Sequence, residues 1–151
     1  MIIHKKYAGG VAGLLERIAE LGKPKVYIGI PSSTNARQGA SNNATIAATH
    51  EMGAPSRGIP ARPFLIPTMQ NNADKYVNLM AQGFRNALQD KTKAAEVYEK
   101  IGLVASSDVK DYIVSGQFVP LKQSTIDRKG SSKPLIDTGE LRNSISYEVR
   151  K

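Results

Sequence analysis

His4, His50 and a scatter of acidic residues are the side chains of this sequence best suited to metal or acid–base chemistry. His50 is followed by Glu51, as at the start of the zinc-binding helix of many metalloproteases, but Ala54 stands where the second histidine ligand would be needed. With two histidines and no cysteine, a zinc site built from several such ligands cannot form. We therefore expect His50 to pack against, or to cap, the end of a helix.

Patterns for nucleophilic catalysis and phosphate binding are also missing from the sequence. No G-x-S-x-G elbow occurs, and the acidic residues do not form a convincing catalytic pair. Gly9, Gly10 and Gly13 precede a predicted helix, but no strand comes before them and no G-K-[ST] follows. The sequence predicts a protein that is not an enzyme and that uses no cofactor or metal.

The charge is the strongest deviation in the composition. Lys and Arg number 21 against 13 Asp and Glu, a formal net charge of +8, and such a surface attracts polyanions, above all nucleic acid. Three interpretations stay open: phosphate contacts, ion pairs with carboxylates of neighbouring subunits, and charge dispersed for solubility. No aromatic residues interleave with the cations, which argues against a single-strand binder. The cations in predicted loops and connectors are Arg37, Arg57, Arg62, Lys122, Arg128, Lys129 and Lys133.

The length of 151 residues suits a single domain spanning residues 1–151, long enough to bury a core without disulfides. The absence of cysteine fits a reducing cytoplasm. No apolar run has the length of a membrane span, and no apolar segment typical of a signal peptide follows the first lysines, so we expect no membrane association.

Hydrophobic spacing predicts the elements of the amino-terminal half. Residues 10–21 place five apolar side chains on one helical face, and alternation over residues 25–30 predicts a half-buried strand. Residues 31–43 are small and polar, which predicts a flexible loop. Asn43 is expected to cap a short helix that ends at Gly53.

Two long helices should follow a proline-rich arm at residues 54–67. The first is predicted from about Phe64 or Pro67 to Gln89, the second from about Lys93 to Val114, and a short hinge would let them pack antiparallel. A short basic helix is expected over residues 123–129, and residues 145–149 alternate as a closing strand. The predicted fold class is α+β, a small antiparallel sheet packed with two long antiparallel helices and shorter helices near both termini.

Three sequence segments occur in an order that carries a family resemblance. They are Ala47-Ala48-Thr49-His50-Glu51-Met52-Gly53, then Ile59-Pro60-Ala61-Arg62-Pro63-Phe64-Leu65, and Leu135-Ile136-Asp137-Thr138-Gly139-Glu140-Leu141-Arg142-Asn143-Ser144-Ile145. This order resembles the phage virion-morphogenesis and tail-completion proteins, which include neck and tail-terminator proteins of long-tailed phages. The matching region spans roughly residues 46–145, about two thirds of the chain.

The resemblance implies a non-enzymatic protein of the phage neck. It would form a homo-oligomeric ring, usually hexameric, that completes or caps the tail tube and joins it to the capsid connector. DNA would pass through the ring without sequence-specific binding, and the protein would be located in the virion, or in the host cytoplasm during assembly. The alternative from another class is a small basic nucleic-acid-binding protein.

Physical roles can be expected for residues of the three segments. Pro60 and Pro63 should hold the arm extended, while Phe64 and Leu65 anchor it to the core. Arg62 should project outward and form an ion pair with a neighbouring subunit or protein. The alternative is that these residues determine the fold without any contact role. The last helix should start at Asp137 and Thr138, with Glu140 completing a capping box and Leu141 facing inward. Arg57, Arg62, Arg128, Lys129 and Lys133 are the candidate interaction residues, the last three facing an acidic partner.

Overall fold

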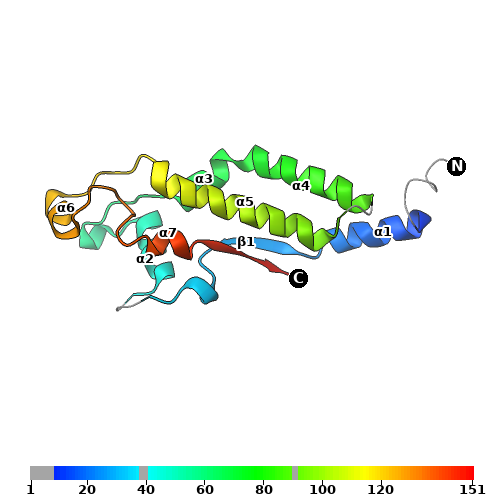
Figure 1. Cartoon of the computed structure of the whole chain (residues 1–151), viewed down its shortest axis with the longest axis horizontal. Coiled ribbons are helices and arrows are strands. Elements are labelled where there is room, and N and C mark those ends of the chain that lie inside the picture. Colours follow the sequence, from blue (N-terminus) through cyan, green and yellow to red (C-terminus); the bar gives the residue numbers. More distant parts are fainter. Residues whose placement is uncertain (1–8, 38–40, 90–91) are drawn as a thin grey trace.

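A computed structural model describes residues 9–37, 41–89 and 92–151, and its elements form an elongated body (Figure 1). The predicted α+β class is confirmed, with helices packed against a two-stranded antiparallel sheet. In order, the elements are α1 (Gly10–Leu21), β1 (Lys25–Gly29), the 3-10 turn Ser32–Thr34, α2 (Asn43–Met52), the 3-10 turn Pro55–Arg57, α3 (Leu65–Asn71), α4 (Ala73–Leu88), α5 (Ala94–Ser115), α6 (Gln123–Lys129), α7 (Glu140–Ser144) and β2 (Ser146–Arg150).

The sheet pairs a strand near the start of the chain with the strand at its end. β1 and β2 run antiparallel, with Val26 opposite Val149 and Ile28 opposite Tyr147. Successive side chains of a strand point to opposite faces, so these four residues share one face. Val26 and Ile28 pack against the core formed with α5, which explains the apolar alternation in β1.

α5 is the central element of the fold. It contacts both strands on one side and α4 on the other, and its inward stripe includes Val97, Ile101, Val109 and Ile113. The core consists of two clusters along this helix: one surrounds Val109 and Ile113, and the other surrounds Val97 and Ile101. Tyr147 of β2 lies directly over Gly102, a site that any larger residue would obstruct.

The predicted long helix after the arm is in fact two helices. α3 ends at Asn71 and α4 begins at Ala73, with Asn72 between them in a non-helical conformation (φ −107°, ψ 11°). The Asn72 side chain donates to the Thr68 carbonyl at 2.9 Å, which satisfies an acceptor at the break. α4 then packs along α5, and Lys75 and Tyr76 both donate to Asp108 across this joint, at 2.7 and 2.9 Å.

α1 forms where the sequence predicts a helix, but most of its apolar face is exposed. Leu21 alone among its residues is buried, while Val11, Leu15 and Ile18 are 52, 60 and 50% exposed. The helix is attached in its second half, where Arg17 donates to the Leu88 carbonyl at 3.3 Å and the Tyr98 hydroxyl donates to the Leu21 carbonyl at 2.6 Å. Its first turns extend beyond the body (Figure 1).

The helix expected to be capped by Asn43 is capped by Asn42. The Asn42 side chain accepts from the Thr45 amide at 2.8 Å. Asn43 is buried, and its amide group donates to the Thr34 and Ala36 carbonyls at 3.3 and 3.2 Å. These bonds hold together the two sides of the segment at residues 31–43. Residues 38–40 lie outside the described residues, so the flexibility of this loop stays a prediction.

No helix in the described part of the chain combines the length and the apolar character that crossing a membrane requires.

Candidate assembly surface

The three sequence segments that carry the family resemblance meet in space. α2 contacts α7, and Phe64 from the arm shares a core cluster with Leu135, Leu141 and Ile145 from the third segment. Phe64 and Ile145 are each 1% exposed. The segments therefore form one packed unit, and their apolar residues anchor it.

Glu51 joins the first segment to the second. Its carboxylate accepts from the backbone amides of Phe64, Leu65 and Ile66 at 2.8, 2.9 and 2.9 Å. These amides belong to the first turn of α3, where N–H groups have no partner within the helix and a negative charge is favoured. Glu51 is thus a remote cap for α3, a role that its place in the first segment did not predict.

The end of α2 and the arm approach each other too closely for a side chain at Gly53. This residue has φ 76°, and a Cβ there would lie 2.8 Å from the Ala61 nitrogen. One residue further along, the Arg62 amide donates to the His50 carbonyl at 2.6 Å. The arm is therefore bound to α2 by its backbone.

The expectation that Arg62 projects outward was wrong. The residue is 5% exposed, and its Nε and Nη2 atoms donate to the Val119 and Pro120 carbonyls at 2.7 and 3.0 Å. Burial lowers the pKa of the Arg62 guanidinium. Arg62 therefore joins the arm to the connector after α5, where two neighbouring carbonyls need a donor with two N–H groups.

The other arm residues differ in burial. Pro60 and Pro63 are exposed in a segment without helix or strand, and Leu65 is half-buried against the cluster around Phe64. An isolated bridge between Ala54 and Ile59 closes the turn that leads into the arm.

The start of α7 differs from the predicted capping box. The N-cap is Gly139, with φ 83°, and no side chain caps the helix from that position. Asp137 is exposed, and Thr138 makes the local contact instead: its Oγ1 accepts from the Glu140 amide at 3.4 Å. Arg37 pairs with Glu140 at 3.2 Å, which ties the loop after β1 to α7. Leu141 is buried, as expected.

His50 lines a pocket of mixed polar and apolar character between α2, α6 and the start of α7. The pocket has a volume of about 210 Å³, and its lining includes Arg37, Lys129, Asp137 and Glu140. Burial lowers the pKa of His50, and the charges of Arg62 and Lys129 lower it further. The imidazole is therefore held neutral, in agreement with a packing role at the end of a helix.

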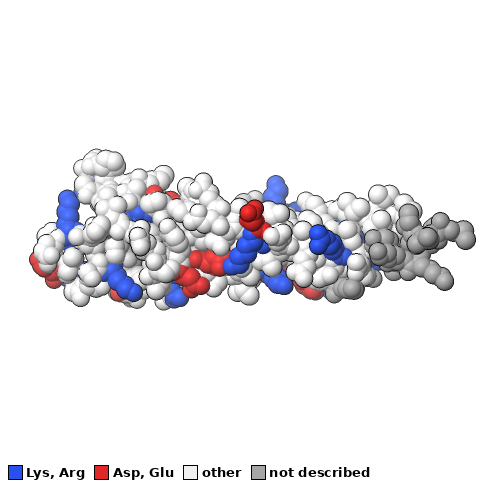
Figure 2. Space-filling model, turned by 90° about the horizontal axis from the view of Figure 1, so that it is seen from above, with Lys and Arg blue, Asp and Glu red and all other residues white. Residues whose placement is uncertain are grey.

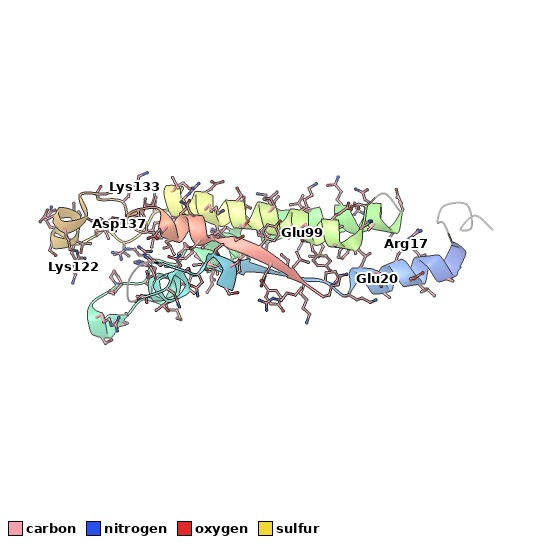
Figure 3. The ribbon with its side chains drawn as sticks, turned by 60° about the horizontal axis from the view of Figure 1, so that its bottom comes forward. Arg17, Glu20, Glu99, Lys122, Lys133 and Asp137 are labelled. Carbon is pink, nitrogen blue, oxygen red and sulfur yellow. The ribbon has the colours of Figure 1, made fainter. Side chains whose placement is uncertain are left out.

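The remaining candidate cations differ in how far their side chains are exposed. Arg57, Arg128 and Lys133 are exposed. Lys129 is half-buried, and its ammonium donates to the Lys133 carbonyl. Burial lowers the pKa of Lys129, although the nearby Asp137 opposes this effect. Arg128 and Lys133 thus remain available for a partner at the α6 end of the body, where Figure 3 places Lys122, Lys133 and Asp137 together.

The sheet offers backbone groups for pairing. Its order is β1-β2, so each strand has one edge without a strand partner in the described part of the chain. On the face away from α5, Arg150 stacks on the Tyr27 ring at 4.9 Å, and Tyr27 is 47% exposed. On the covered face, the Glu99 carboxylate accepts a hydrogen bond from the Tyr147 hydroxyl and so raises the pKa of Tyr147 (Glu99 is labelled in Figure 3).

Within the described residues, no three His, Asp or Glu side chains gather closely enough to hold a metal ion. Comparisons of the chain with protein-family profiles, curated protein sequences and solved structures found no significant match.

Proposed function

We propose that this chain is a non-enzymatic structural protein of a phage neck. It forms a homo-oligomeric ring, in the hexameric form usual for the proteins it resembles, and the ring completes or caps the tail tube and joins it to the capsid connector. The observation that carries the proposal is the convergence of the three resemblance segments, which are distant in sequence, into one packed unit through Glu51, Phe64 and Leu141.

The architecture supports assembly between copies. A two-stranded sheet with an open edge on each strand can be extended by a strand of a neighbouring subunit, since main-chain hydrogen bonds supply affinity in such additions. β1 and β2 present different edges. A contact between them would therefore join unlike patches, as a closed ring requires.

The charge of the protein suits contacts with other proteins around a DNA passage. In this proposal, Arg57, Arg128 and Lys133 face solvent or an acidic partner, because a strongly cationic channel would bind phosphates and slow DNA transit. On the face shown in Figure 2, Lys and Arg lie apart from one another and among acidic residues. That face gives no support to the alternative of a nucleic-acid-binding protein.

Deletion of the gene from the phage or prophage that encodes the chain tests the proposal directly. We expect DNA-filled heads and unjoined tails by electron microscopy, and we expect the protein itself in wild-type virions by mass spectrometry. Normally joined, infectious particles without the protein would refute the neck role. A salt titration of duplex DNA binding tests the alternative, which requires tight binding that weakens steeply with salt.

Reversal of the two exposed charges near α6 tests the contact with an acidic partner. Arg128→Glu with Lys133→Glu should slow the joining of heads to tails, most strongly at low salt, because charge complementarity mainly speeds encounter. The matched control is Lys100→Glu, an exposed change on α5. Joining at the control rate across all salt concentrations would exclude this surface.

A further inference from the structure

Among the described helices, α1 carries the most exposed large apolar residues, and they form a stripe along it. Val11, Leu15 and Ile18 recur at the spacing that places side chains on one helical face, and each is at least half exposed. Scattered exposed apolar residues are common, but a continuous stripe on a protruding helix marks an interaction site. The stripe spans roughly 10 Å, because a helix rises about 1.5 Å per residue.

A groove of complementary character lies between α2 and α3. It has a volume of about 320 Å³, and its lining combines small residues of α2 with larger apolar residues of the arm and α3. Met52 and Ile66, which are 73 and 55% exposed, belong to this lining. The sole charged group there is Glu51, whose carboxylate already accepts from three backbone amides. The lining residues from α2 are Ala44, Ala47, Ala48, Glu51 and Met52.

The residue sizes on the two surfaces suit helix packing. The alanines of α2 let a second helix approach closely, since the distance between packed helices is set by the side chains at the contact. Large residues on the incoming helix would then fill the groove between the alanines and Ile66, as ridges fill grooves in helix packing. α2 is about 15 Å long at the usual rise per residue, so it can accept the whole stripe of α1.

One molecule cannot join its own two surfaces. α1 is fixed in its second half by Arg17 and Leu21, and its first turns extend away from the body, whereas α2 lies in the other half of the molecule (Figure 1). Figure 3 likewise places Arg17 and Glu20 of α1 at the end opposite Lys122 and Asp137. We propose that α1 of one copy docks in the α2–α3 groove of a second copy.

This contact joins unlike surfaces, so it leaves one α1 and one groove free in any pair and continues until the copies close a ring. The inference deepens the proposed function. The contact between copies is argued from the two surfaces, and only its use in a ring rests on the proposed function. The helix itself carries Glu16 and Glu20 against the single cation Arg17. A basic polar face, which membrane-surface helices use to bind anionic lipids, is absent from α1, and this favours a protein partner.

The buried area decides when the contact forms. Three half-exposed apolar side chains and the groove that receives them would bury on the order of 500–600 Å² in total, well below the roughly 1,200–2,000 Å² of a stable interface. A single contact is therefore weak. It becomes stable when a second contact between the same copies, such as strand pairing, raises the effective concentration of α1 near the groove.

The lack of cysteine in the sequence allows a direct test by cross-linking. Purified Leu15→Cys and Met52→Cys proteins are mixed at high concentration with a short bis-maleimide, and the matched control replaces the second protein with Val77→Cys. Val77 lies on α4 and is 65% exposed, comparable to Met52. We expect about tenfold more cross-linked product for Leu15→Cys with Met52→Cys than with the control. A tenfold ratio of yields corresponds to a tenfold difference in affinity between the docked pair and a chance contact. Equal yields for the two pairs would overturn the proposal.

A second variant separates docking from chance collision. Ile18→Asp in the Leu15→Cys protein should reduce the product severalfold, whereas Val77→Asp in the same protein should leave it unchanged. Equal effects of the two aspartates would refute docking between copies. A second refuting result would be that the protein sediments with anionic vesicles, that Ile18→Asp abolishes this sedimentation, and that Ile18→Asp leaves the cross-linking unchanged. These measurements use purified protein alone, so they test the docking contact separately from the neck role. Docking can be refuted while the protein is still found in virions, and docking can be supported while the neck role is refuted.

Discussion

Replacement of Glu51 should destabilise the fold more than its half-buried position suggests. Its carboxylate accepts three backbone N–H groups at 2.8–2.9 Å. A hydrogen bond to a charged group contributes about 1.5–3 kcal/mol, and loss of a helix cap costs about 0.5–2 kcal/mol. The three bonds share one acceptor and are not additive, so we expect a loss of about 3 kcal/mol for Glu51→Ala.

Glu51→Gln isolates the role of the charge at nearly constant shape. The amide retains one acceptor oxygen, and its NH₂ group would face an N–H that it cannot bond. We expect a loss of about 2 kcal/mol, or a decrease in melting temperature of about 4–8 °C for a chain of this length. Urea unfolding at pH 7 with an unchanged m-value measures this loss. Glu16→Gln, an exposed change on α1, is the matched control and should alter stability by less than about 0.5 kcal/mol.

Amide hydrogen exchange tests the cause of the effect. In Glu51→Gln, the amides of Phe64, Leu65 and Ile66 should exchange faster than in the wild type, while amides in the middle of α5 change only as global stability does. Equal melting temperatures for Glu51→Gln and Glu16→Gln would refute the remote cap. Unchanged protection of the three amides would refute it as well.

Three further predictions concern the same unit. Arg62→Ala should lower the free energy of unfolding by about 2–4 kcal/mol, because two carbonyls lose a charged donor. The exposed Arg57→Ala should lower it by less than about 0.5 kcal/mol. Similar urea midpoints for the two variants would instead favour a role of Arg62 in contacts with another subunit or protein. Phe64→Ala should cost about 3–5 kcal/mol through the cavity it leaves, and a loss under 1 kcal/mol in urea unfolding would contradict its place in the core. The lowered pKa of His50 should make wild-type stability fall by up to about 1.4 kcal/mol per pH unit as pH drops below about 6.5, where the unfolded state gains a proton that the folded state does not. His50→Gln should lack this part of the slope, and parallel pH curves for the two proteins would contradict the prediction.

Periodicity in the sequence was enough to predict the elements with strong patterns. α5 and α6 lie within one residue of the predicted ranges, and the two strands pair as an antiparallel sheet. The break at Asn72 was missed because no glycine or proline marks it, and Pro67 sits in the first turn of α3, where proline is tolerated. The amphipathic pattern of α1 predicts a helix, but it cannot tell whether the apolar face meets its own chain or another.

The roles of Arg62 and Glu51 depend on partners that are distant in sequence. Arg62 bonds carbonyls more than fifty residues away, so an arginine between two prolines reads as a surface residue until the fold brings the connector to it. For Glu51 there was a usable signal. The predicted helix begins at about Phe64 or Pro67, and neither start is preceded by Ser, Thr, Asp or Asn. An uncapped helix start requires an acceptor from elsewhere.

The two helix starts of the resemblance segments show why the nearest polar residue is an unreliable guide to a cap. Asp137 and Glu140 have capping-box spacing, yet Gly139 between them adopts φ 83° and begins the helix itself. The N-cap is therefore Gly139, two residues after Asp137, and no side chain caps the helix from that position. α3 has no local cap at all and takes Glu51 from another helix. In both cases the backbone conformation decides which acceptor is in range, and in α3 the remote acceptor also binds two of the three segments into one unit.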